Sequence, residues 1–309
     1  MLELDPRIAK AISSTPPQPL RAETLSMFRA AGNKTSAPSP GVERRDYIIE
    51  RAHAVAVRVH RPAGAGSGLP CVYSMHGGGF VFGSYANDDA RLDGWSSSHR
   101  CVAVSVDYRL APETPFPGPL DDCYLGLKWV FDHHDELGVD PGRIGVSGTS
   151  AGAGLAAALA LLARDRGEVP LQFQLLDAPM IDDRQATPSS QRDDLVIFDR
   201  EASEFGWRSY LGDLYGKPEV PAYAAPARSA DLGGLPAAYI CAGNVDGFRD
   251  DAIGYATRLN QAGVPAELHI YAGAPHGVKQ FADVPVARRY TGGINEWIGA
   301  QLQDPGPAG

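Results

Sequence analysis

The chain has 309 residues, of which 44% are hydrophobic and 21% charged, with 35 glycines and 25 prolines. These proportions exclude a disordered polymer, a coiled coil and a collagen-like repeat, and they predict a globular protein with a large core. The formal net charge of -9 gives no electrostatic reason to bind nucleic acid or an anionic membrane surface. At about 150 residues per domain, the length fits either two domains or one large α/β unit.

The chain shows no sign of a membrane segment or a secretion signal. No apolar run approaches the roughly 20 residues that span a bilayer, and the N-terminus lacks a basic segment followed by an apolar one. The cysteines have no CxxC spacing and mostly lie within apolar runs, so we expect buried free thiols rather than disulfides or metal ligands. A cytoplasmic location is expected. The four cysteines are Cys71, Cys101, Cys123 and Cys241.

Residues 1–42 indicate two helical pieces broken by prolines at positions 16, 17 and 19, followed by a loop. Eight short β-rich runs come next, and helix-length segments separate the later ones. This alternation predicts right-handed crossovers and a mostly parallel sheet covered on both faces, while the short link between the first two runs predicts an antiparallel hairpin. The expected strands are 46–50, 54–60, 70–75, 101–107, 143–147, 171–176, 237–242 and 266–271, and the expected helices include 120–133, 151–164, 250–262 and 287–302.

One long segment, residues 182–230, contains no expected strand. It carries charged residues, several prolines and six aromatic side chains, and its stretch 199–211 has a helical pattern. An insertion of this length in an α/β fold is either a mobile loop or a small helical cap. The helical pattern favours the cap.

Residues 148–152 read Gly-Thr-Ser-Ala-Gly between an expected strand and an Ala/Leu-rich helix. A sharp strand-to-helix turn of this kind exposes a serine hydroxyl above the sheet, and glycines at its flanks let neighbouring backbone approach. Ser150 is therefore the candidate nucleophile. A chance match and a phosphate-binding turn are the alternatives, but neither G-x-x-x-x-G-K-[ST] nor G-x-G-x-x-G occurs in the chain.

A glycine-rich loop follows the expected strand 70–75 and reads His76-Gly77-Gly78-Gly79. Acyl transfer passes through an oxyanion that needs two or three backbone N–H donors, and consecutive glycines can present them in a concave turn. The predicted donors are Gly77 and Gly78, together with Ala151 after the nucleophile. His76 and Gly79 are expected to support the loop, with His76 orienting it by hydrogen bonding rather than acting as a base.

Two further residues lie just beyond the ends of expected strands, where open α/β sheets build their sites. His276 follows the strand 266–271 and is the candidate base; Asp246 follows the strand 237–242 and is the candidate acid that orients it. Asp250 and Asp251 fit better as charges in the first turn of the next helix. The chain order serine, aspartate, histidine is the one expected of the α/β-hydrolase fold.

Several motifs agree in order and spacing with those of one known family. They are His76-Gly-Gly-Gly-Phe-Val-Phe-Gly83, Asp107-Tyr-Arg-Leu-Ala-Pro-Glu113, the Ser150 turn, Asp246-x-x-Arg249-Asp250 and His276-Gly277. From about residue 46 to its end, the chain resembles the hormone-sensitive-lipase-like bacterial carboxylesterases. Thr149 stands where that family often has aspartate, which places the chain with the GTSAG branch. Gly247 and Val278 also depart from the frequent proline and phenylalanine.

The resemblance implies an α/β-hydrolase fold with an eight-stranded, mostly parallel sheet, flanking helices and a helical cap. The cap would comprise residues 1–42 and 182–230, and the catalytic domain residues 43–181 and 231–309. Dimers in the family commonly form through the edge strand and last helix, here 266–271 and 287–302. Three residues would be scaffolding rather than chemistry: Tyr108, Arg109 and Glu113.

The predicted function is hydrolysis of short- to medium-chain acyl esters by a Ser-His-Asp acyl-enzyme mechanism. The partner is a small-molecule ester, and neither a metal nor an organic cofactor is required. Two alternatives stay open: an amidase or aryl-formamidase with the same triad, and a non-catalytic small-ligand-binding protein. The retained serine, aspartate and histidine argue against the second.

Overall fold

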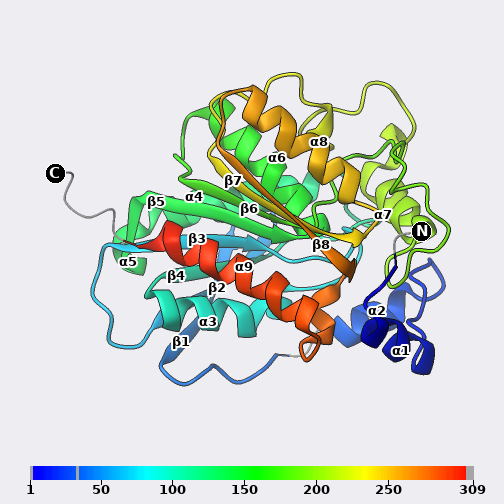
Figure 1. The fold of residues 1–309 in the computed structure, drawn as a ribbon. Helices are drawn as coiled ribbons and strands as arrows, with labels where there is room; N and C mark the ends of the chain where they lie inside the picture. Colours follow the sequence, from blue (N-terminus) through cyan, green and yellow to red (C-terminus); the bar gives the residue numbers. More distant parts are fainter. Residues whose placement is uncertain (1–2, 33–34, 304–309) are drawn as a thin grey trace.

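A central sheet of eight strands organises the computed structural model, which describes residues 3–32 and 35–303 (Figure 1). The strand order is β1-β2-β4-β3-β5-β6-β7-β8. All eight predicted strands are present and the predicted mostly parallel sheet is confirmed. The strands are β1 (Val42–Glu50), β2 (Ala54–Pro62), β3 (Leu69–Met75), β4 (Val102–Asp107), β5 (Val139–Thr149), β6 (Phe173–Asp177), β7 (Ala237–Val245) and β8 (Ala266–Pro275).

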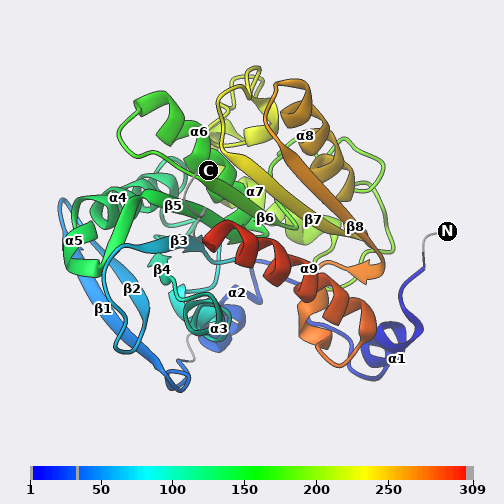
Figure 2. The same cartoon turned by 60° about the vertical axis from the view of Figure 1, so that its left-hand side comes forward.

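Antiparallel pairing is confined to one side of the sheet. β1 pairs with β2 and β2 with β4 in antiparallel register, whereas the pairs from β4 through β3 and β5 to β8 are parallel. The β1–β2 hairpin therefore forms one edge of the sheet and β8 the other (Figure 2). Because the strands from β3 to β8 run in one direction, their carboxyl ends meet at the same end of the molecule.

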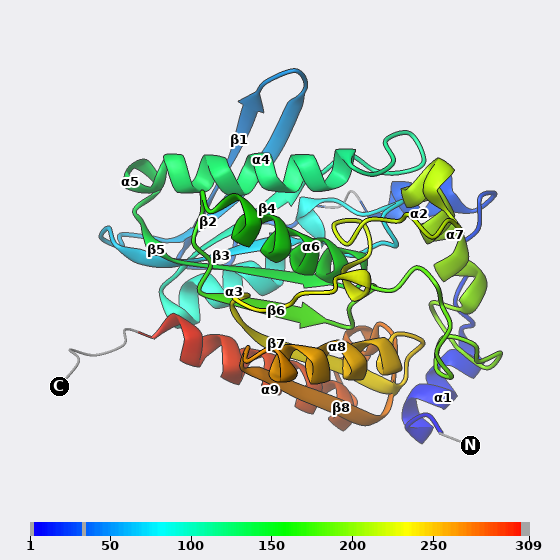
Figure 3. The same cartoon turned by 90° about the horizontal axis from the view of Figure 1, so that it is seen from above.

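Helices cover both faces of the sheet, as Figures 1 and 3 show. α4, α6 and α8 pack on one face, and α3 and α9 on the other. The helices are α1 (Pro6–Ser14), α2 (Leu25–Gly32), α3 (Asp89–His99), α4 (Gly118–Asp132), α5 (His134–Leu137), α6 (Ala151–Arg166), α7 (Arg200–Leu211), α8 (Arg249–Gln261) and α9 (Pro285–Leu302). Short 3-10 turns add η1 (Tyr85–Asp88), η2 (Gly212–Leu214), η3 (Pro226–Arg228) and η4 (Val278–Phe281). Among the described residues, no helix is long and apolar enough to cross a membrane.

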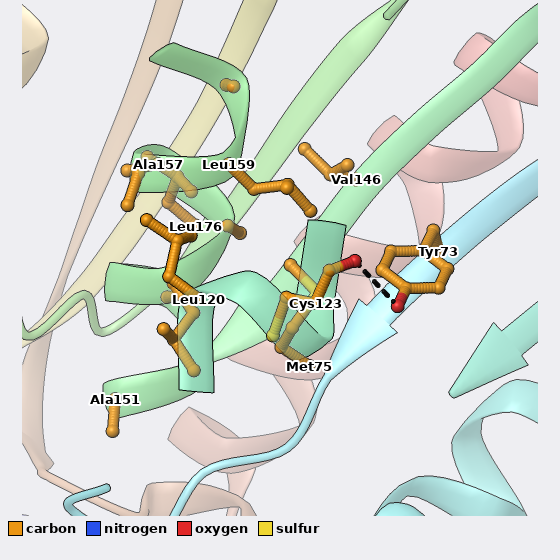
Figure 4. Packing of buried hydrophobic residues seen from close by; sticks show 14 of the residues in the cluster. Tyr73, Met75, Leu120, Cys123, Val146, Ala151, Ala157, Leu159 and Leu176 are labelled. Atoms are coloured by element: carbon orange, nitrogen blue, oxygen red, sulfur yellow. Dashed lines mark hydrogen bonds between the residues drawn. The ribbon is translucent and has the colours of Figure 1, made fainter. Parts of the chain in front are cut away.

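The alternation of side chains along each strand divides the core into two layers. On β3, Tyr73 and Met75 belong to the cluster beneath α4 and α6, whereas Val72 belongs to the cluster beneath α3 and α9. Figure 4 shows the first layer, where the Tyr73 hydroxyl donates a 2.9 Å hydrogen bond to the Cys123 carbonyl. All four cysteines are buried and free, as the apolar runs around them predict.

α6 is buried along most of its length because its small side chains allow close packing on the sheet. Every residue from 151 to 163 is buried. A Cβ atom at Gly154 would clash with the Met180 carbonyl oxygen, so this position requires glycine. The helix that directly follows the candidate nucleophile is thus buried and closely packed on the sheet.

Besides the short α5, three helices of the described chain are not among those that cover the two faces of the sheet. α1 and α2 precede the first strand, and α7 follows β6; all three lie near the carboxyl ends of the parallel strands (Figures 1 and 3). Arg21 links the N-terminal segment that carries α1 and α2 to α7. Its guanidinium lies 2.9 Å from the carboxylate of Asp199, at the start of α7.

Candidate active site

Ser150 occupies the turn between β5 and α6 in a strained backbone conformation. Its φ of 58° lies in the left-handed region, which a side-chain-bearing residue rarely adopts. Hydrogen bonds hold the strained backbone: the Ser150 amide donates to the Asp177 carbonyl at 2.8 Å, and the Ser150 carbonyl accepts from Met180 at 3.1 Å. The flanking glycines are required, because a Cβ at Gly148 or Gly152 would clash with neighbouring backbone.

His276 and Asp246 meet Ser150 at the carboxyl end of the sheet. Each follows the last residue of a strand, β8 and β7 respectively. His276 Nε2 lies 3.0 Å from Ser150 Oγ, and His276 Nδ1 lies 2.8 Å from Asp246 Oδ2. With the Nδ1 proton donated to the carboxylate, the lone pair of Nε2 faces the serine hydroxyl. The structure thus brings together three residues that the sequence predicted separately.

The surroundings of His276 shift its pKa upward. Burial of the ring opposes its charged form, but the charge of Asp246 and its hydrogen bond outweigh burial and raise the pKa above the usual value. Aromatic rings enclose the imidazole on two sides, with ring centroids 5.3 Å away for Phe198 and 5.2 Å for Phe248. The Asp246 carboxylate is itself held by the Phe248 amide at 2.9 Å.

The glycine-rich loop lies directly against the serine turn. A Cβ atom at Gly77 would stand 3.5 Å from Ser150 Cβ and 3.0 Å from the Thr149 carbonyl oxygen. Gly78 has a φ of 126°, and a Cβ there would clash with the Phe82 carbonyl. Gly77 therefore lies against Ser150, Gly78 follows Gly77 in the loop, and Ala151, the first residue of α6, directly follows Ser150.

His76 is buried behind this loop, where its contacts are with Gly77 and Tyr108. Its Nδ1 donates a 2.8 Å hydrogen bond to the Gly77 carbonyl, and its ring stacks on Tyr108 with centroids 4.2 Å apart. The Tyr108 hydroxyl donates to the His76 carbonyl at 2.8 Å. Burial lowers the pKa of His76, so the ring stays neutral at neutral pH. Gly79, on the other side of the loop, faces the Phe198 ring.

Two of the three residues expected as scaffolding, Arg109 and Glu113, form ion pairs. Arg109 makes two hydrogen bonds of 2.8 Å to the buried Asp122 carboxylate. Glu113 binds Arg29 of α2 through two hydrogen bonds of 2.7 Å. Asp250 lies in the first turn of α8, as expected, and accepts a 2.8 Å bond from the Ser189 amide.

Two charged residues that lie close to Ser150 and His276 are not among the predicted site residues. Asp177 is the last residue of β6, and Lys279 lies three residues after His276; they form an ion pair. A charge at the end of an otherwise apolar strand, at the site-forming end of the sheet, is the signal that marks Asp177. Nothing local marks Lys279, because its partner lies 102 residues away.

Comparison with known proteins gives a family and a set of similar enzymes. Residues 72–280 match a family model described as the alpha/beta hydrolase fold. The carboxylesterase NlhH of Mycobacterium tuberculosis (strain ATCC 25618 / H37Rv) is 35% identical over 299 residues, covering 94% of this chain and 93% of that protein. The esterase LipI of the same strain is 40% identical over 224 residues, covering 72% and 70%.

The solved structure of a bacterial heroin esterase superimposes with a TM-score of 0.90 at 37% identity, covering 97% of this chain and 98% of that one. The chain therefore belongs to the alpha/beta hydrolase fold family. Within that family it belongs with the carboxylic ester hydrolases, and the resemblance to the hormone-sensitive-lipase-like esterases is confirmed.

Proposed function

We propose that this protein is a serine carboxylesterase that hydrolyses short- to medium-chain acyl esters through a covalent acyl-enzyme. The observation that carries the proposal is the hydrogen-bonded chain from Asp246 through His276 to Ser150, with distances of 2.8 and 3.0 Å. A buried base that faces a serine hydroxyl, and is itself oriented by a carboxylate, is the arrangement that activates serine as a nucleophile.

In the acylation half-reaction, Ser150 Oγ attacks the ester carbonyl carbon while His276 Nε2 takes the hydroxyl proton. The carbonyl oxygen becomes an oxyanion, and the amides of Gly77, Gly78 and Ala151 stabilise it. The carbon–oxygen bond to the alcohol then breaks, and His276 passes its proton to the departing oxygen. Asp246 stays ionised and stabilises the imidazolium.

Deacylation repeats these steps with water. His276 takes a proton from a water molecule, whose oxygen attacks the acyl carbon bound to Ser150. The same amides hold the second oxyanion. When the bond to Ser150 Oγ breaks, the proton returns to the serine and the carboxylic acid leaves.

The proposal of a short acyl chain is supported by the position of Phe198. Its ring packs on His276, and its Cζ lies 3.2 Å from where a Cβ of Gly79 would stand, so it narrows the space between base and oxyanion loop. The preceding Ile197 has a φ of 71°, and the Phe198 amide donates to the Val196 carbonyl at 2.8 Å, which together form a strained γ-turn. A β-branched residue keeps such a conformation only where its surroundings enforce it.

We assign Phe198 to a cap built from residues 1–42 and 182–230. Leu20, from the first segment, also faces Gly79, with its Cδ2 3.7 Å from the Cβ position. Side chains from both segments therefore border the glycine-rich loop. Their apolar character suits the acyl or alcohol groups of an uncharged ester.

A series of p-nitrophenyl esters from acetate to dodecanoate tests the proposal. We expect turnover that is highest for the short and medium chains, and a single organophosphate adduct on Ser150 detected by peptide mass spectrometry. Amides matched to the best esters provide the second arm: faster amide than ester cleavage would indicate an amidase. Complete inertness toward both, without an adduct, would instead indicate a small-ligand-binding protein.

A further inference from the structure

A buried carboxylate behind the triad joins the segments that carry the nucleophile and the base. Asp177, at the end of β6, is only 1% exposed. Its carboxylate accepts hydrogen bonds from the Thr149 hydroxyl at 3.0 Å, from the Tyr290 hydroxyl at 2.6 Å and from Lys279 Nζ. Thr149 directly precedes Ser150, and Lys279 follows His276 by three residues.

The Thr149 hydroxyl uses its full hydrogen-bonding capacity in this cluster. It donates to Asp177 and accepts from Lys279 Nζ at 3.1 Å and from Arg91 Nη1 at 3.0 Å. Arg91 is also ion-paired with Asp88 at 2.8 Å. An aspartate at position 149 would place a second carboxylate against Asp177, so a neutral hydroxyl suits this position.

We infer that Lys279, Thr149 and Asp177 act as a clamp that fixes His276 relative to Ser150 and balances the charge around the imidazole. This inference rests on the proposed function. The Asp177 carbonyl holds the Ser150 amide at 2.8 Å, while its carboxylate holds Lys279 on the loop of His276. Both ends of the Ser150–His276 hydrogen bond are thus anchored to one residue, which makes the three clamp residues positioning residues.

The clamp also sets two opposing charges near His276. The charged groups that act on the ring are Asp246 after β7, Asp177 at the end of β6 and Lys279 on η4. The Asp177 carboxylate favours the imidazolium, whereas the Lys279 ammonium opposes it. Removing the Lys279 charge alone and removing the Asp177 charge alone should therefore shift the pKa of His276 in opposite directions.

The decisive experiment compares the pH dependence of kcat/KM for the wild type, K279M and D177N. Loss of the ammonium moves the acid limb to higher pH, and loss of the carboxylate moves it to lower pH, each by about half a pH unit. K279R keeps the charge and should keep the wild-type limb. The matched control is K128M, which removes a lysine paired with Asp132 on α4 and should leave the profile unchanged.

A third variant separates geometry from charge. T149V removes the hydroxyl but leaves the Lys279–Asp177 ion pair, so the acid limb should stay in place. The loss of alignment should nevertheless lower kcat, by about tenfold, because small displacements of reacting groups are costly. Wild-type kcat in T149V would overturn the positioning role.

The pKa of His276 measured by NMR provides a readout that does not depend on turnover. An identical pKa in wild type, K279M and D177N, or a shift of both variants in the same direction, would overturn the clamp. If D177N does not fold, the contrast between K279M and K279R decides the question alone. A wild type that cleaves no ester would contradict the proposed function, while opposite NMR shifts would still support the charge balance.

Discussion

Arg21 and Asp199 are joined by two hydrogen bonds of 3.0 and 2.9 Å across 178 residues of sequence. The pair ties the N-terminal segment to the start of α7, where the Asp199 carboxylate also accepts a 2.8 Å bond from the Ala202 amide. Phe198, whose ring packs beside His276, directly precedes Asp199. We therefore expect the ion pair to help hold the Phe198 ring in place beside His276.

We expect R21Q to raise KM for p-nitrophenyl butyrate about threefold or more while lowering kcat less, because the loosened Phe198 ring binds the substrate less well. Thermal stability should change little, since the Arg21 and Asp199 side chains remain 26% and 35% exposed. R208Q is the control, because it breaks a surface pair with Glu204 within α7. Equal kinetics for the two variants would contradict this role of Arg21.

Substitution of Phe198 should change the preferred acyl length. F198A removes the ring between His276 and Gly79, and the space it leaves accommodates several further methylene groups. The ratio of kcat/KM for octanoate to that for butyrate should increase about tenfold or more, since burying even one or two further methylene groups, at on the order of 1 kcal/mol each, corresponds to about a tenfold change. F131A, on α4, is the size-matched control. An unchanged ratio in F198A would show that another residue limits chain length.

The pH profile should show a histidine that titrates above its ordinary range. Below the pKa of His276 the imidazole is protonated and cannot accept the Ser150 proton, so kcat/KM should fall as the pH drops through that value. D246N removes the charge that raises the pKa and disturbs the tautomer, and kcat should fall about 10⁴-fold. S150A should lose about 10⁶-fold. Retained turnover in S150A would contradict the assignment of the nucleophile.

Asp251 should make the fold less stable at alkaline pH. Burial and the nearby Asp182 charge raise its pKa from 3.8 to about 7, and its Oδ1 is buried with no partner among the described residues. The folded protein thus holds a proton that the unfolded chain releases near pH 4. The free energy of unfolding should decrease as the pH rises from about 4 to about 7.

D251N removes this penalty, which for a pKa raised from 3.8 to about 7 amounts to at most about 4 kcal/mol, and should stabilise the protein at pH 8 with a rise in Tm of several degrees. At pH 4, where both forms are neutral, the Tm difference should vanish. Tm measured at the two pH values checks the expectation. D250N is the control. Burial raises the pKa of Asp250, but its ion pair with Arg249 and its hydrogen bond from the Ser189 amide outweigh burial and lower the pKa, so D250N should not stabilise the protein.

The strands and the proposed triad were predictable because their signals are local. A buried strand reads as an apolar run, and Ser150, Asp246 and His276 each follow such a run in a turn with nearby glycine. Chain order then links the three residues. Local signals of this kind need no knowledge of which segments meet in space.

Features that depend on distant partners were not predictable in this way. α3 is absent from the predicted helices because its buried face includes Asp89 and Asp93, which look like surface residues. Both carboxylates bind Arg44 of β1, at 2.8 and 2.6 Å. The ion pair between Lys279 and Asp177 likewise could not be predicted, because it forms only where η4 comes close to the end of β6.

The burial of all four thiols has a practical consequence for spectroscopy. Burial raises the pKa of each thiol, to about 12 for Cys101, so the thiolate that reacts with maleimides is scarce under native conditions. A cysteine introduced at an exposed position such as Met27 of α2 would then be the preferred site for a fluorophore. Such a label would report any movement of the N-terminal segment during turnover in the otherwise wild-type chain, without first replacing the native cysteines.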